Sequence, residues 1–273
     1  MAFRVPEDMF LAADEIACAA YIFGPEVSNP TSSDKLLVTT GANFISRKCL
    51  LTRVPGEQVV QDVLDILACH LTNEHKKIFK SPSMWYLPTI FSQLALSWTR
   101  SPDNLREQFA NKYMDKIFVP IHDGNKHWFL MILDMNKDRI FLLDSAKSTS
   151  SNYHRRFSVE TMAYFIERMF SHHTFYKEIN HVVPRVSKFK IIKLESLLQQ
   201  RKGSNDCGIW IAEWMKECGW TEDFDITVTE STRMRLAIDL VTGGSKLKKA
   251  EVTSKAHGYM KELIEKQSKL KTV

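Results

Sequence analysis

The sequence contains few cysteines, and none of the spacings that cysteine-based structural sites need. Its five cysteines are an odd number, no two of them form a CxxC pair, and no HExxH motif occurs. A disulfide framework and the common kinds of zinc site therefore lack support, and we expect neither a metal nor another cofactor. Sparse, unpaired cysteines are typical of a reducing compartment, so we expect the nucleus or the cytoplasm.

Long uncharged apolar segments are also missing. The best candidate for a membrane span, residues 11–23, is interrupted by Asp14 and Glu15, so we expect no such span and no membrane partner. The first ten residues lack a basic leader followed by an apolar stretch, which gives secretion no support. The 10 glycines, 9 prolines and 25% charged residues of the 273-residue chain are near average. That composition excludes a collagenous, disordered or coiled-coil protein and permits a globular enzyme.

Excess positive charge is missing from most of the chain. Residues 246–273 hold eight lysines against three glutamates, which accounts for the whole net charge of +5. Because the remaining residues are balanced, we do not expect the core to bind nucleic acid. The basic tail is interpreted as a solvated helical or frayed end, with nuclear targeting or attraction to an acidic partner as the alternatives.

The hydrophobic pattern changes period along the chain. A helical period predicts helices over residues 57–71, 87–98, 158–170 and 231–241, and from 207 onwards. Short segments rich in Ile, Phe, Val and Leu predict strands at residues 116–121, 127–135, 139–143 and 189–194. Central strands with helices before and after them indicate an α+β domain.

These elements also divide the chain. We expect residues 1–39 to pack on the core, 40–245 to form the main domain, and 246–273 to form the basic, helical tail.

One cysteine has a local sequence that favours reactivity. Cys207 opens a predicted helix in the segment GSNDCGIW, where backbone N–H groups and the helix dipole stabilise a thiolate. Cys218 would lie about 16 Å away at the far end of the same helix, too far to share the site. Taken alone, the pattern also fits a buried structural cysteine, since free cysteines usually behave as small apolar residues.

A histidine and a carboxylate are brought together by the predicted hairpin. If a two-residue turn at 136–137 joins the strands, His127 and Asp144 become diagonal neighbours on one face, close enough for their side chains to meet. Asp134 then points to the other face, whereas a three-residue turn would reverse this parity. His122 is a rival base, which we place in a loop or at the rim of the site.

A thiol, an imidazole and a carboxylate in series are what nucleophilic thiol catalysis requires. His127 would take the proton of Cys207, Asp144 would orient the imidazole, and the helix start would favour the thiolate. Acyl transfer also needs donors for an oxyanion. The Cys207 N–H is one, and the side-chain amide of Gln200 is our candidate for the second, with Gln199 as its competitor.

Three segments carry a family resemblance. KHWFLMILD (126–134), FLLDS (141–145) and QQRKGSNDCGIW (199–210) present His, Asp, Gln and Cys in that order. They resemble the ubiquitin-like-protein-specific cysteine proteases, the SUMO-protease or Ulp-like family. The segment that begins LTRVPGEQVV resembles the opening helix of that family, so the likeness spans roughly Leu50 to Val241.

The resemblance implies a papain-like α+β fold, with a central mixed sheet flanked by helices and the catalytic cysteine at a helix N-terminus. It implies cleavage after the C-terminal Gly-Gly of a SUMO-like modifier, either from target lysines or from a precursor, without a cofactor. The partners would be the modifier and its conjugates. His127, Asp144, Cys207 and Gln200 would be the catalytic residues, and Trp128 would cover the channel that holds the glycine tail. A packed core aromatic is the alternative for Trp128.

Two positions depart from the family pattern. Much of the family has its oxyanion glutamine six residues before the cysteine, where this chain has Arg201, while Gln200 is seven before. Many members also begin the opening helix with Trp-Leu-Asn-Asp, where this chain has residues 58–61, QVVQ. These departures favour one alternative, a catalytically silent module that binds ubiquitin-like proteins. A second alternative is an acetyltransferase that uses the same residues with acetyl-CoA.

Overall fold

A computed structural model describes twelve segments of the chain. They are residues 5–25, 36–40, 43–51, 58–79, 83–97, 114–124, 127–147, 149–171, 182–194, 196–218, 221–243 and 246–271. The chain forms two compact units, one made of Met1–His70 with Val228–Val273 and the other of Leu71–Thr227. None of the helices in these segments is both long and apolar enough to cross a bilayer.

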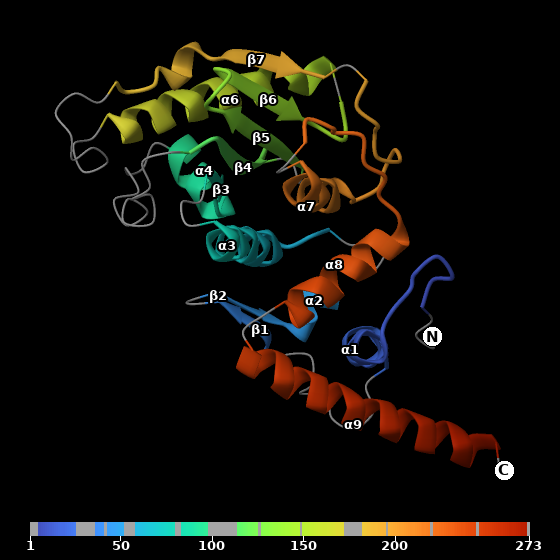
Figure 1. The fold of residues 1–273 in the computed structure, drawn as a ribbon. Coiled ribbons are helices and arrows are strands. Elements are labelled where there is room, and N and C mark those ends of the chain that lie inside the picture. The colour runs from blue at the N-terminus through green and yellow to red at the C-terminus, as the bar shows by residue number, and fades with distance from the viewer. Residues whose placement is uncertain are drawn as a thin grey trace. The chain divides into compact units, whose positions relative to one another are not determined.

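The second unit is built on a mixed five-stranded sheet (Figure 1). Its strands, in spatial order, are β3 (Met84–Tyr86), β4 (Lys116–His122), β5 (Trp128–Asp134), β6 (Arg139–Leu143) and β7 (Lys190–Lys193). The three central strands are antiparallel, while β3 pairs with β4 and β7 with β6 in parallel. The α+β class and the mixed sheet are thus confirmed. β3 was missed, because three buried residues are too few to show a period.

The register of β5 and β6 is the one predicted from the sequence. Leu130 faces Leu143 and Asp134 faces Arg139, which sets every other pair along the two strands. The connection differs from the predicted two-residue turn. The last pair of the ladder is Asp134 with Arg139, so residues 135–138 form the connection, and Asp138 in it adopts a positive φ of 50°. A four-residue connection centred on the same bond leaves the same residues opposite each other, so the register survives the change of turn.

Helices α4 (Thr89–Ser97) and α6 (Thr149–Phe170) share a hydrophobic core with the sheet. Alternate residues of β4, β5 and β6 enter this core, as strand geometry requires for one face of a sheet. Phe129 and Met131 of β5 and Met162 and Ile166 of α6 are completely buried in it. This packing fixes the central strands, and with them the chain segments at their ends.

Helix α7 (Cys207–Glu217) contacts β5 and is anchored by aromatic side chains. Trp214 is completely buried, and its indole N–H donates to the carbonyl oxygen of Phe224 (3.1 Å). The helix begins where the N–H groups of Ile209 and Trp210 both bond to the Asp206 carbonyl oxygen. The sequence-predicted helix start at Cys207 is therefore confirmed.

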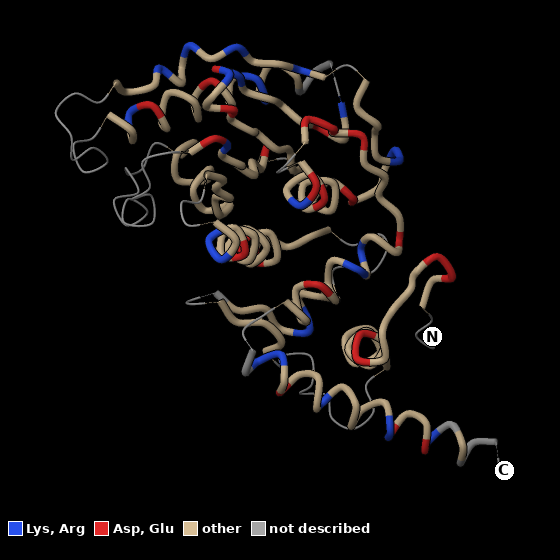
Figure 2. Tube along the Cα trace, viewed as in Figure 1, with Lys and Arg blue, Asp and Glu red and all other residues tan. Residues whose placement is uncertain are grey.

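The first unit contains most of the remaining elements. They are α1 (Ala13–Phe23), β1 (Leu36–Thr40), β2 (Asn43–Ser46), α2 (Arg47–Leu51), the first part of α3 (Gln61–Ile78), α8 (Glu230–Thr242) and α9 (Lys246–Lys271). The basic tail is thus a helix, with lysines recurring along it (Figure 2), and one side of α9 packs against α1. Val252 and Ala256 are buried there, and the rings of Tyr21 and Tyr259 meet edge to face at 5.7 Å. Residues of α9 therefore belong to a packed core, and α9 is not a frayed end.

We predict that Phe129→Ala lowers the free energy of unfolding by about 3–5 kcal/mol, because it leaves a cavity between the sheet and its helices. Urea denaturation followed by circular dichroism measures the change. Phe157→Ala is the matched control, since Phe157 on α6 is 56% exposed and its loss should cost no more than about 0.5 kcal/mol. Equal effects of the two variants would contradict the assigned core.

Candidate active site

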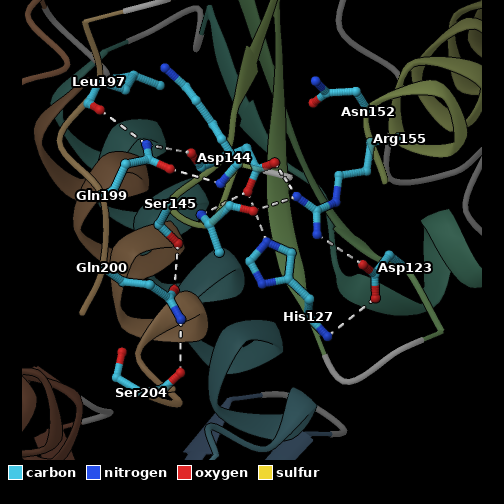
Figure 3. Close-up of polar contacts among 12 residues, drawn as sticks. Asp123, His127, Asp144, Ser145, Asn152, Arg155, Leu197, Gln199, Gln200 and Ser204 are labelled. Atoms are coloured by element: carbon cyan, nitrogen blue, oxygen red, sulfur yellow. Dashed lines mark hydrogen bonds and ion pairs between the residues drawn. The ribbon is translucent and has the colours of Figure 1, made fainter. Parts of the chain in front are cut away.

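A histidine and an aspartate meet at one end of the antiparallel pair β5–β6. His127 immediately precedes β5 and Asp144 immediately follows β6, so the two strands deliver both residues to the same edge. The His127 Nε2 atom lies 2.9 Å from Asp144 Oδ1, and both residues are buried (Figure 3). Asp134 lies at the far end of β5, where it contacts Lys137 and Arg139. The predicted contact between His127 and Asp144 is therefore observed.

Cys207 reaches this pair from the start of α7. Nε2 of His127 is directed at Asp144, and the Cys207 thiol interacts with the same imidazole and helps to raise its pKa. Cys207 is 2% exposed, so its position alone would also fit the structural alternative. Its interaction with a buried imidazole, together with the N–H groups of the first helical turn, distinguishes it from an inert core thiol.

The ionisation of His127 and Asp144 is coupled. Burial by itself lowers the pKa of His127, but hydrogen bonds with Asp144 and Cys207 and the charge of Cys207 raise that pKa to about 9. For Asp144, burial acts in the other direction and raises the pKa. The hydrogen bond from His127 and the charge of Arg155 outweigh burial, so the pKa of Asp144 lies below its usual value. A protonated imidazole beside an ionised carboxylate is thus the favoured state near neutral pH. An imidazolium in turn stabilises a thiolate.

Two further cysteines, Cys218 and Cys18, have surroundings that favour the protonated thiol. Cys218 at the end of α7 is buried, and burial raises its pKa to about 12. Burial also raises the pKa of Cys18. Both thiols are therefore protonated at neutral pH, and neither favours nucleophilic attack. Among the described residues, no three His, Cys, Asp or Glu side chains are grouped so that they could hold a metal ion.

The two candidate oxyanion glutamines have different partners. The Gln200 side chain accepts from the Ser145 hydroxyl (2.7 Å) and donates to the Ser204 carbonyl oxygen (2.8 Å), three residues before Cys207. Gln199 donates to the Asp144 carbonyl oxygen (3.2 Å) and accepts from the Lys147 N–H. Of the two glutamines, Gln200 is therefore the one whose side-chain amide hydrogen-bonds the loop that leads into α7.

Trp128 and His122 form a pair beside the site. Trp128 is 4% exposed, and its ring lies 4.7 Å from that of His122 at an angle of 65°. The Nδ1 atom of His122 accepts a hydrogen bond from the Gly124 N–H, and burial lowers the pKa of His122. The His122 ring thus packs against Trp128, and its Nδ1 atom is hydrogen-bonded within the turn that follows β4. The burial of Trp128 is compatible both with a packed aromatic and with one wall of a narrow channel.

Arg155 was missed by reasoning from sequence. It projects from α6 and donates through Nη1 to Asp144 Oδ2 and to the Ala146 carbonyl oxygen (2.8 Å), and through Nη2 to Asp123 Oδ2 (3.3 Å). The remaining oxygen of Asp123 accepts from the His127 backbone N–H (3.2 Å). No sequence pattern marks this arginine, because only the packing of α6 on the sheet brings it to the site.

Comparison with known families decides the class of this site. Residues 70–239 match the Ulp1 protease family, C-terminal catalytic domain, a range that includes His127, Asp144, Gln200 and Cys207. The chain belongs to the Ulp1 protease family. It therefore carries the catalytic domain of a cysteine protease, and the resemblance expected over Leu50 to Val241 is confirmed across most of its length. Among curated proteins, no sequence matches the chain.

Solved Ulp1-family structures share the fold at low sequence identity. SUMO protease Ulp1 with its catalytic cysteine oxidised to a sulfenic acid is 20% identical, covers 87% of this chain and 97% of its own, and has a TM-score of 0.65. The C-terminal Ulp1 protease domain in complex with Smt3, the yeast ortholog of SUMO, is 19% identical, with 89% and 99% covered and a TM-score of 0.65. The Chaetomium thermophilum Ulp1-like SUMO protease catalytic domain is 16% identical, with 89% and 95% covered and a TM-score of 0.58.

We predict that Asp144→Asn lowers the pKa of His127 from about 9, because a neutral carboxamide no longer favours the imidazolium. It should also lower protease turnover by about tenfold or more, since less of the imidazolium that supports the Cys207 thiolate is then present. An NMR titration of the imidazole resonances measures the first effect. His75, whose Nε2 accepts from the Ser83 N–H, serves as the internal control and should titrate as before. An unchanged His127 titration would remove Asp144 from the coupled site.

Proposed function

We propose that this Ulp1-family domain cleaves after the C-terminal Gly-Gly of a SUMO-like modifier. The reaction would release the modifier from target lysines or trim its precursor. The observation that carries the proposal is the buried hydrogen bond between His127 and Asp144, on an imidazole whose pKa is also raised by Cys207 at the start of α7. The modifier class is supported by the structurally similar Ulp1 domain in complex with Smt3.

The chemistry begins with the Cys207 thiolate, which attacks the carbonyl carbon of the terminal glycine. His127 takes the thiol proton and then gives it to the departing amine, so that a thioester replaces the amide or isopeptide bond. A water molecule, deprotonated by His127, then hydrolyses the thioester and frees the glycine carboxylate. Asp144 keeps the ring in the orientation that both proton transfers need.

The tetrahedral intermediates carry an oxyanion that needs fixed donors. We assign this role to the Cys207 backbone N–H and the Gln200 side-chain amide. One hydrogen of that amide is directed at the Ser204 carbonyl oxygen, and the carboxamide oxygen is fixed by Ser145. An amide preset in this way loses little orientational freedom during the reaction. Trp128 is proposed to line the narrow channel for the glycine tail, which excludes residues with larger side chains.

Covalent labelling separates this proposal from a catalytically silent binding module. A SUMO-like modifier that ends in a vinyl sulfone should label the wild-type protein at Cys207, whereas Cys207→Ser should remain unlabelled but folded. Cys218→Ser is the matched control from the other end of α7, and it should be labelled as the wild type is. Mass spectrometry locates the modified residue, and a modifier panel identifies the one preferred. Binding without labelling would support the silent module and contradict the protease.

The two glutamines offer a second test. We predict that Gln200→Ala lowers kcat by about 10²–10³-fold, as loss of one oxyanion donor does in comparable sites. Gln199→Ala should cost clearly less, because that side chain braces the Asp144 carbonyl oxygen and the Lys147 N–H. Cleavage of a modifier with a fluorogenic C-terminal amide measures both variants. A larger loss in Gln199→Ala would transfer the oxyanion role to Gln199.

A further inference from the structure

A single buried guanidinium connects the two carboxylates beside His127. Arg155 is 6% exposed, and its side chain extends from α6 toward the end of β6 (Figure 3). Its Nη1 atom donates to Asp144 Oδ2 and to the Ala146 carbonyl oxygen, while Nη2 donates to Asp123 Oδ2. The planar fork of arginine suits such a bridge, whereas lysine presents only a point charge.

Each bridged carboxylate holds a different part of the histidine. Asp144 binds the imidazole through Nε2, at 2.9 Å. Asp123 accepts the His127 backbone N–H through Oδ1, at 3.2 Å. Arg155 is therefore linked to His127 twice. Asp144 connects it to the imidazole ring, and Asp123 connects it to the backbone N–H.

We propose that Arg155 is a positioning residue, which orients His127 toward Cys207 by fixing both carboxylates that hold the histidine. Its effect on turnover rests on the proposed protease function, but its effect on the imidazole does not. The hydrogen bonds of Arg155 among the described residues go to Asp144, Ala146 and Asp123, so its action on the ring is indirect.

The charges around His127 come from several elements. Asp144 follows β6, Cys207 begins α7, and His122 lies at the end of β4. Asp144 and Cys207 favour the imidazolium, whereas the positive charge of Arg155 opposes it. Asp123, which accepts from the His127 N–H, is itself paired with Arg155.

The positive charge of Arg155 stabilises the Asp144 carboxylate and destabilises the His127 imidazolium, so it lowers the pKa of both groups. Arg155 helps to keep Asp144 ionised, and it reduces the pKa of His127 that Asp144 and Cys207 raise. Without the guanidinium, the pKa values of both His127 and Asp144 should move upward. The His127 titration therefore reports the charge at position 155, whereas a lower kcat at an unchanged titration reports the positioning of the ring.

Arg155→Met tests the proposal, since methionine keeps the apolar stem and removes the fork. We expect kcat to fall about 10–100-fold with KM little changed, as for loss of a residue that orients a catalytic group. The basic limb of the pH–rate profile and the NMR titration of His127 should both move to higher pH. Arg156→Met is the matched control, because the neighbouring Arg156 is exposed and pairs with Glu160 at 2.9 Å.

The conservative variant separates charge from geometry. Arg155→Lys keeps the positive charge but cannot bridge Asp144 and Asp123 with a planar fork. We therefore expect a His127 titration near that of the wild type, together with a reduced kcat. If Arg155→Met fails to fold, Arg155→Lys carries the test, and a kcat equal to the wild-type value overturns the proposal.

Other outcomes also overturn it. A folded Arg155→Met protein with an unchanged His127 titration would show that the guanidinium does not act on the imidazole. Equal shifts in Arg155→Met and Arg156→Met would show a general effect of removing charge from α6. Should the wild type cleave no modifier at all, the proposed function fails, while the titrations of the variants still support or overturn the role of Arg155.

Discussion

The hydrogen bond between His127 and Asp144 is the contact on which the rest of the site depends. It exists because the register of β5 and β6 places the residue before one strand beside the residue after the other. A slip of one residue would exchange the two faces of the hairpin and move the carboxylate away from the ring. Completely buried residues such as Phe129 and Leu143 make that slip costly, so the core of the sheet also determines the geometry of the site.

A buried carboxylate must be compensated for this arrangement to be stable. Asp144 receives an imidazole N–H, the Ala146 backbone N–H (3.0 Å) and the guanidinium of Arg155. These donors overcome the desolvation that would otherwise raise the pKa of Asp144. Its negative charge in turn supports a protonated His127 in a place where burial alone would favour the neutral ring. The surroundings of Asp144 thus govern the charge of the imidazole with which Cys207 interacts.

Local patterns were sufficient to predict the central hairpin, the start of α7 and the pairing of His127 with Asp144. Each of these follows from a period or spacing within one stretch of chain, and the four-residue turn at Asp138 did not alter the parity. Contacts between distant elements were out of reach. Arg155 looks like any other arginine on a helix, and the packing of α9 on α1 requires knowledge of two segments that are far apart. The division into residues 1–39, 40–245 and 246–273 stays a prediction.

The loop before α7 is also tied to the segment that carries Asp144. The Gln200 backbone N–H donates to the Ser145 carbonyl oxygen (2.8 Å), and the Ser145 hydroxyl donates to the Gln200 side chain. Gln199 adds a bond to the carbonyl oxygen of Asp144 itself. The extra residue between Gln200 and Cys207 need not misplace the amide, because Gln200 takes its position from Ser145 as well as from its distance to the cysteine. Anchoring across the fold can thus compensate for a loop whose length departs from the family pattern.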